Sequence, residues 1–216
     1  MPESQRKTPV RGERRHYEQR RRAEQSRQTR SGIIAAAHEL LGDRDAPQLT
    51  LDEVARAARV SRATVYNQFG SRRALLAAVF EDLGRVIGYE RVQAAQRMED
   101  PRIALEMTIR EACRCWSSRR TAIRRILALG VLDREIDELN ARYEQYRRAE
   151  IGGLAKRLEE AHLLRGIALH DASVVLGALT GPYAFDLVGG DNAPDLAADR
   201  LVHMAGASLG IHLHAA

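Results

Sequence analysis

From residue 30 onward, apolar side chains recur at intervals of three and four residues, which is the period of a helix that buries one face. Ile33, Ile34, Ala37, Leu40 and Leu41 begin this pattern. No stretch of the chain alternates apolar and polar residues as a half-buried strand does. Hydrophobic residues make up 44% of the 216 residues, which is ample for a buried core. The sequence therefore predicts an all-α protein.

Glycine, proline and capping residues divide this pattern into separate helices. Thr50 and Glu53 have the spacing of a capping box, and Ser61 and Ser71 are expected to cap the next two helices. Pro182 lies inside a predicted helix and is expected to kink it. The predicted helices cover about residues 30–42, 50–58, 61–69, 71–87, 101–116, 118–130, 132–164, 171–188 and 195–212.

The two short helices between residues 50 and 69 carry the clearest functional signal. Two such helices joined by a turn of three or four residues form a helix-turn-helix, in which the second helix enters the DNA major groove. A small core is expected to fix the angle between them, formed by Leu51, Val54, Ala55, Val60, Val65 and Phe69. This arrangement leaves six side chains of the second helix facing outward: Arg62, Ala63, Thr64, Tyr66, Asn67 and Gln68.

The charge distribution agrees with a nucleic-acid partner. The first 27 residues hold nine basic and four acidic side chains, so this arm alone carries the formal net charge of +5 of the whole chain. A second basic segment, from Val54 to Phe80, holds five arginines and no acid. Basic surfaces bind the phosphate backbone through counterion release, whatever the base sequence. Three readings of the arm stay open: a clamp on the minor groove or backbone, general electrostatic steering, or a solvated tail without a role.

Individual side chains of the second helix suit different parts of a duplex. Arg62, Asn67 and Gln68 can make bidentate contacts with guanine or adenine edges. Ala63 can touch a thymine methyl, whereas Thr64 and Tyr66 suit phosphate.

These residues resemble the DNA-binding domain of TetR-type transcriptional regulators. The resemblance rests on Leu51-Asp-Glu-Val-Ala, on Val60-Ser-Arg-Ala-Thr-Val-Tyr-Asn-Gln-Phe69 and on Ser71-Arg-Arg-Ala-Leu-Leu76, and in detail it covers residues 28 to 83. There are two departures: Arg59 stands where the family usually has a turn glycine, and Arg72 where it usually has lysine.

The resemblance implies an all-helical homodimer with three DNA-binding helices, joined by a long fourth helix to a C-terminal helical domain. In such regulators a ligand in the C-terminal domain shifts the fourth helix and releases a palindromic operator. The expected domains are a disordered or partly helical basic arm (1–27), a helix-turn-helix domain (28–83) and a ligand-binding and dimerisation domain (84–216). Carried over by position, the DNA contacts fall on Thr50, Arg62, Ala63, Thr64, Tyr66, Asn67, Gln68 and Arg72.

The last two predicted helices are unusually apolar and are expected to form the homodimer interface. Three small residues permit close approach of the helices: Gly177, Ala178 and Gly181. Six larger apolar residues are expected to fill a four-helix seam: Leu176, Leu179, Leu187, Leu201, Met204 and Leu209. An alternative is that these helices pack within one subunit. A pocket for an unknown small-molecule effector is expected among the C-terminal helices, with candidate lining residues Met107, Cys113, Trp116, Tyr143, Tyr146, Tyr183 and Phe185.

Other classes of function find less support in the sequence. It shows no catalytic constellation, no cofactor motif and no convincing metal-ligand cluster, and we expect none of the three. It also lacks a signal peptide and a transmembrane segment, which predicts a cytoplasmic protein without a membrane partner. The main hypothesis is a ligand-released homodimeric repressor. The alternatives are a constitutive or architectural DNA binder with a filled C-terminal core, or an enzyme or carrier with an incidental helical hairpin.

Overall fold

The computed structural model describes residues 11–42, 49–190 and 192–213, and all regular secondary structure within them is helical. The all-α prediction is confirmed for these residues. None of their helices is long and apolar enough to cross a membrane. The helices are α1 (Arg11–Gly42), α2 (Leu51–Ala57), α3 (Arg62–Phe69), α4 (Arg72–Val86), α5 (Tyr89–Gln96), α6 (Pro101–Ser118), α7 (Arg120–Gly130), α8 (Arg134–Glu160), α9 (Leu169–Leu179), α10 (Pro182–Leu187) and α11 (Pro194–Leu209).

The chain divides into two compact units, Met1–Leu75 and Leu76–Ala216. The division lies within α4, whose first turn belongs to the first unit and whose later turns belong to the second. The domain boundary near residue 83 stays a prediction.

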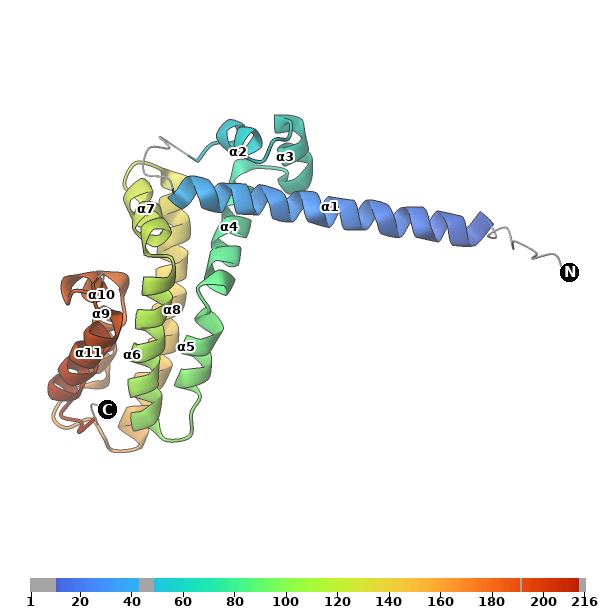
Figure 1. The fold of residues 1–216 in the computed structure, drawn as a ribbon. Helices are drawn as coiled ribbons and strands as arrows, with labels where there is room; N and C mark the ends of the chain where they lie inside the picture. Colours follow the sequence, from blue (N-terminus) through green and yellow to red (C-terminus); the bar gives the residue numbers. More distant parts are fainter. Residues whose placement is uncertain (1–10, 43–48, 191, 214–216) are drawn as a thin grey trace, which may run out of the picture. The chain divides into compact units, whose positions relative to one another are not determined.

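The first unit is built from α1, α2, α3 and the start of α4 (Figure 1). Helices α2 and α3 pack against each other and against the C-terminal half of α1. Their contact surface is apolar, and Ile33, Ala37, Val54 and Val65 are fully buried in it. The expected core between the short helices is therefore largely present, although Leu51 and Val60 are only half-buried.

Helix α1 begins much earlier than the apolar pattern indicates. It starts at Arg11, so residues 11–27, which we assigned to a basic arm, form its first turns; residues 1–10 of the arm lie outside the described residues. Every side chain from His16 to Gln28 is exposed. Because residues 13–28 contain no glycine or proline, nothing in them interrupts the helix.

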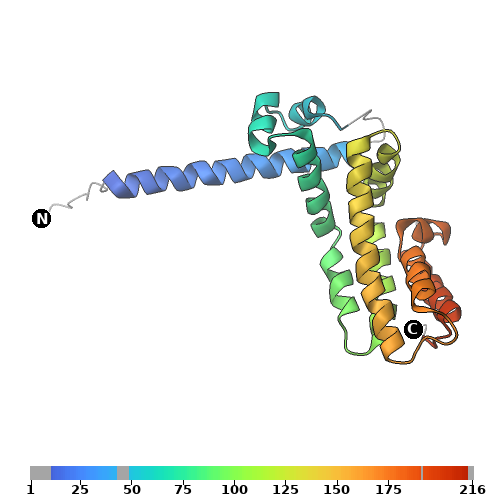
Figure 2. The same ribbon diagram turned by 180° about the vertical axis from the view of Figure 1, so that it is seen from behind.

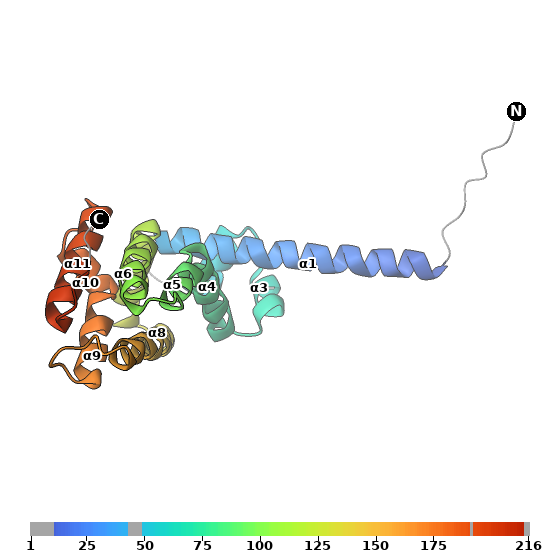
Figure 3. The same ribbon diagram turned by 90° about the horizontal axis from the view of Figure 1, so that it is seen from below.

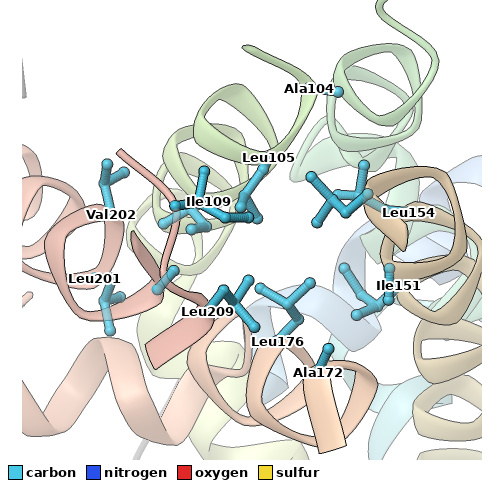
Figure 4. Packing of buried hydrophobic residues seen from close by; sticks show 14 of the residues in the cluster. Ala104, Leu105, Ile109, Ile151, Leu154, Ala172, Leu176, Leu201, Val202 and Leu209 are labelled. Carbon is cyan, nitrogen blue, oxygen red and sulfur yellow. The ribbon is translucent and has the colours of Figure 1, made fainter. Parts of the chain in front are cut away.

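The second unit has its core where α6, α8, α9 and α11 meet (Figures 2 and 3). Figure 4 shows Leu105 and Ile109 of α6 directed toward Leu176 of α9, with Leu154 of α8 beside them. Leu105, Ile109 and Leu176 have no exposed surface, and Leu154 has 2%. Burying a side chain of this size contributes about 1.5–3 kcal/mol. This cluster therefore holds the four helices together.

Three parts of the second unit differ from the sequence prediction. Helix α5 lies between residues 87 and 101, where no helix is predicted. The helix expected to run to residue 164 ends at Glu160, because His162 adopts a left-handed conformation (φ 55°) and the amide of Leu163 donates to the carbonyl of Leu158. The kinked helix expected over residues 171–188 is instead two helices, α9 and α10. Pro182 cannot donate a backbone hydrogen bond and favours an extended Gly181, so the chain breaks there and restarts.

Both cysteines are free thiols in the core of the second unit. Burial in this apolar setting raises the pKa of Cys113 and of Cys115 to about 12. Neither thiol is therefore appreciably ionised at neutral pH, and both act as small core residues.

Candidate nucleic-acid interface and apolar pocket

Helix α3 has one buried face and one exposed face. Val65 and Phe69, four residues apart, are buried against the rest of the first unit. Arg62, Ala63, Tyr66 and Asn67 lie on the other side and are exposed; 58% of Tyr66 is accessible. These four belong to the eight residues predicted to contact DNA, and they form a contiguous surface.

The other four predicted contact residues are engaged within the first unit. Thr50 caps α2: its hydroxyl accepts from the Glu53 amide at 3.2 Å, and its own amide donates to the Glu53 carboxylate at 3.0 Å. The capping box is thus confirmed. The Thr64 hydroxyl lies 2.8 Å from that of Ser61, which caps α3 as predicted. Arg72 Nε donates to the carbonyl of Leu49 at 3.0 Å and so fixes the start of α4.

Gln68 is the fourth of these residues, and it connects α3 to α1. Its amide nitrogen donates to the hydroxyl of Ser26 at 3.1 Å. Arg30 of α1 adds a 2.7 Å hydrogen bond to the Gln68 carbonyl, and its guanidinium lies 4.1 Å from the centroid of the Phe69 ring. The sequence did not indicate this role of Arg30. The one general rule that could have suggested it is that arginine side chains bind free carbonyls at the C-terminal end of a helix, here α3. These contacts hold the exposed basic part of α1 at a defined angle to α3.

The basic surface is partly neutralised by an acid that precedes the arginine-rich segment. Arg62 Nη1 lies 3.0 Å from Asp52 Oδ2, and both side chains are more than half exposed. An exposed pair of this kind contributes at most about 1 kcal/mol. A phosphate or a guanine edge can therefore compete for Arg62 at little cost.

Arg59 occupies the turn between α2 and α3 in the left-handed conformation, with φ of 54°. Its amide donates to the Arg56 carbonyl, and the amide of Val60 donates to the Ala55 carbonyl. This pair of bonds is a Schellman motif, whose left-handed position favours glycine or asparagine. The backbone of this turn therefore has the conformation that glycine favours, and the β-carbon of Arg59 introduces strain there.

We expect Arg59→Asn to raise the melting temperature by about 2–4 °C, because asparagine tolerates the left-handed region and relief of the strain is worth about 1 kcal/mol. Arg59→Ala is the matched control: it removes the same charge, but alanine lacks the short polar side chain by which asparagine tolerates the left-handed conformation. Thermal denaturation of the two variants measures the difference. Equal melting temperatures would show that the turn is unstrained.

An apolar pocket of about 200 Å³ lies within the second unit, between the later turns of α4 and helices α6, α7 and α8. Of the seven residues predicted to line it, the structure brings Trp116, Tyr143 and Tyr146 to its wall. Cys113 and Phe185 belong to the buried core instead. Tyr183 is 72% exposed on α10, and Met107 is half-buried on α6; neither lines the pocket. The wall includes further residues that the sequence did not indicate: Phe80, Leu83, Gly84, Ile87, Tyr89, Ile123, Ile126, Leu127, Asn140, Glu144, Arg147 and Pro182.

Polar side chains at one edge of the pocket are bonded to one another. Tyr89 donates its hydroxyl to Glu150 at 2.9 Å, and Gln93 donates to Glu150 at 2.7 Å and to the Tyr146 hydroxyl at 2.9 Å. Burial, followed by the charge of Glu150, raises the pKa of Tyr89 well above its ordinary value, so its hydroxyl stays protonated as the donor. The network holds Tyr89 and Tyr146 in fixed positions on the wall.

Arg147 of α8 connects the pocket to the break between α9 and α10. Only 8% of this residue is exposed. Its guanidinium donates twice to the Glu144 carboxylate, at 2.9 and 2.8 Å. It also donates to the Thr180 hydroxyl and to the Gly177 carbonyl, both at 2.8 Å. On the pocket side, Trp116 Nε1 donates to the Thr180 carbonyl at 2.9 Å.

An open groove of about 950 Å³ lies along α8, α9, α10 and α11 in the same unit. Its wall includes large apolar side chains that are exposed: Val174 (57%), Tyr183 (72%), Leu187 (87%) and Met204 (42%). Three other residues predicted to fill a dimer seam, Leu176, Leu201 and Leu209, are at least 98% buried within the chain itself, although Leu201 also reaches the groove wall. Gly177 and Gly181 are also buried, whereas Ala178 is exposed and Leu179 is half-buried on the groove wall.

The residues that form the helix-turn-helix also match the sequence model of a known protein family. Residues 33–79 match the family model described as "Bacterial regulatory proteins, tetR family". The match covers α2, α3 and the adjoining parts of α1 and α4, so it is these residues that resemble the family.

One curated relative is similar over the same segment, and two solved structures share the fold. Over 46 residues, which are 21% of this chain, it is 50% identical to the HTH-type transcriptional regulator AlkX of Mycobacterium tuberculosis; the match spans only 22% of that relative. The fold is similar to that of NalD, described as the secondary repressor of the MexAB-OprM multidrug efflux pump in Pseudomonas aeruginosa (TM-score 0.63, 24% identity, 86% of this chain and 97% of that one). It is also similar to AibR, solved in complex with isovaleryl coenzyme A and operator DNA (TM-score 0.62, 17% identity, 82% of this chain and 97% of that one).

Proposed function

We propose that this protein is a homodimeric transcriptional repressor that binds a palindromic operator and leaves it when a small molecule occupies the apolar pocket. The observation that carries the proposal is the exposed face of α3, where Arg62, Ala63, Tyr66 and Asn67 form a contiguous surface on a helix of a helix-turn-helix. A recognition helix of eight residues can reach only a few base edges. Such heads therefore bind as dimers on paired half-sites.

The exposed apolar groove over α9, α10 and α11 supports dimerisation through this face. Contiguous exposed apolar side chains of this size mark interaction surfaces on soluble domains. The interface proposed here keeps Leu187 and Met204 of the predicted seam and adds Val174 and Tyr183. It does not rest on the predicted leucines that are buried within the chain.

Leu187→Glu is expected to weaken dimerisation at least 100-fold, because it places a charge in the centre of an apolar interface. Leu187 is 87% exposed in the single chain, so the change leaves folding intact. Leu132→Glu is the matched control, since Leu132 is 89% exposed at the turn before α8 and lies outside the groove. Sedimentation equilibrium measures both. A Leu187→Glu protein that stays dimeric would place the interface elsewhere.

The pocket supports a ligand-responsive regulator over a constitutive or architectural DNA binder, for which we expected a filled C-terminal core. Phe80, Leu83 and Ile87 of α4 line the pocket, and Arg72 in the first turn of the same helix bonds to Leu49 of the DNA-binding unit. A ligand that displaces the later turns of α4 acts on a helix that begins in the DNA-binding unit. AibR, whose fold is similar, was solved with both an acyl-coenzyme A ligand and operator DNA.

The basic start of α1 is proposed to add affinity that does not depend on base sequence. Deleting residues 1–24 removes eight basic and four acidic side chains. We expect the deletion to reduce the slope of log affinity against log salt concentration, because fewer counterions are released when phosphates are bound. The preference for operator over random DNA should not change. An unchanged salt slope would show that the arm makes no contact with DNA.

Footprinting on the promoter beside its own gene tests the repressor proposal. The expected result is a protected palindrome whose half-sites lie about 10 base pairs apart centre to centre, or a multiple of that spacing. Protection of a single half-site, or none, would contradict a dimeric repressor.

A further inference from the structure

The walls of the apolar pocket limit the chemistry of what it binds. Its volume of about 200 Å³ is somewhat larger than the roughly 150 Å³ cavity known to accept benzene in another protein. Phe80, Leu83, Ile123 and Ile126 supply apolar wall, and the Phe80 ring lies 5.6 Å from that of Tyr143. The pocket therefore has the size and surface for one or two aromatic rings.

The charged groups at the pocket wall are already paired. Glu144 and Arg147 are the only charged residues among its lining residues. Both oxygens of Glu144 accept from Arg147, and one also accepts from Arg148 at 2.7 Å. A ligand carboxylate or ammonium has to break this pair or enter without a counter-charge, and either course is costly in an apolar site.

The side chain of Asn140 provides an acceptor at the wall that can orient a ligand. Asn140 uses its amide nitrogen to donate to the carbonyl of Ile126 at 3.2 Å. Its amide oxygen, the other half of the same group, is an acceptor suited to a ligand hydroxyl or N–H.

Gly84 lies on the pocket wall within α4, and a β-carbon added there meets no atom within 4 Å. Glycine inside a helix costs up to about 1 kcal/mol relative to alanine. Here it leaves open space on the α4 side of the pocket.

We propose that the pocket binds an uncharged aromatic molecule of one or two rings with one hydrogen-bond donor, and that Gly84 sets its size limit. This inference rests on the proposed effector function and names the class of effector. A larger side chain at position 84 begins in open space and reduces the room left for a ligand. A ligand of the same shape that carries a carboxylate binds poorly because it finds no free cation.

Titration calorimetry of the full-length protein tests the proposal with 1-naphthol and 1-naphthoate, which share their ring system. We expect one 1-naphthol per chain and at least tenfold weaker binding of 1-naphthoate. Gly84→Leu should reduce 1-naphthol affinity at least tenfold. Gly153→Leu is the matched control: Gly153 lies on exposed helix surface of α8, also has no atom within 4 Å of an added β-carbon, and does not line the pocket. Both variants should melt about 2–4 °C higher than the parent.

Three results would overturn the inference: equal or tighter binding of 1-naphthoate, no binding of either compound, or undiminished 1-naphthol binding by Gly84→Leu. Operator binding by the same preparations, measured without ligand, shows whether only the proposed effector class is wrong or whether the proposed regulator function is wrong as well. If the parent and Gly84→Leu both hold the operator, the regulator stands and only the effector class is wrong.

Discussion

Asn67→Ala is expected to reduce operator affinity about 30-fold or more while leaving affinity for random DNA unchanged. Asn67 is exposed on α3 beside Tyr66, and an asparagine amide can pair with an adenine edge. Each such pair is worth about 1–3 kcal/mol, and a dimer loses it twice. Alanine is a better helix former than asparagine, so the helix itself is not weakened. Fluorescence anisotropy with operator and random duplexes measures both affinities.

Tyr66→Ala and Arg62→Ala distinguish base reading from backbone binding. Tyr66 is assigned to phosphate, so Tyr66→Ala should weaken binding to operator and random DNA alike. Arg62→Ala should weaken operator binding while the dimer stays intact. Gln145→Ala, an exposed change on α8, serves as the control. Loss of the dimer in any of the α3 variants would show that this face is structural.

Arg147→Met is expected to lower the free energy of unfolding by about 3 kcal/mol, with a fall of roughly 10 °C in melting temperature. The variant leaves the Glu144 carboxylate without its bidentate partner and removes the donors to Thr180 and Gly177. Arg148→Met is the matched control, because Arg148 bonds to the same carboxylate from a side chain that is 72% exposed. Its expected cost is at most about 0.5 kcal/mol. Equal effects of the two changes would contradict a structural role for the buried pair.

The same network predicts a pH dependence. Burial by itself raises the pKa of Glu144, but hydrogen bonds from Arg147 and Arg148 outweigh it and hold the pKa below its ordinary value. A lowered pKa means that the stabilisation is present above the pKa of the unfolded chain and is lost as pH falls through the folded value. Unfolding measured below about pH 4 should therefore be less pH-dependent in Arg147→Met than in the parent protein.

Local features of the fold were predictable from sequence, because a few neighbouring residues determine them. The capping box at Thr50 and the caps at Ser61 and Ser71 are examples: in each, a hydroxyl accepts from an amide three residues later. The separation of α3 into a buried face with Val65 and Phe69 and an exposed face follows from helical periodicity alone.

Features that depend on residues far apart in the chain were not predictable. Ser26 and Gln68 are 42 positions apart, and Arg147 and Thr180 are 33 apart. An arginine within a helical pattern is normally predicted to be exposed, so nothing in the sequence indicated that Arg147 is buried near the break between α9 and α10. The apolar residues of α9, α10 and α11 were likewise ambiguous: the pattern does not tell an internal core residue such as Leu176 from an exposed one such as Leu187.

The most direct test of the central claim is the ratio of affinities for operator and for random DNA of equal length at physiological salt. A sequence-specific dimeric regulator should prefer the operator by about 10³-fold or more. The random duplex reports the electrostatic attraction of the basic arm and of the arginines near α3, and the ratio reports base reading by α3. Equal affinity for the two duplexes would contradict the account, because the exposed face of α3 would then hold DNA without reading it.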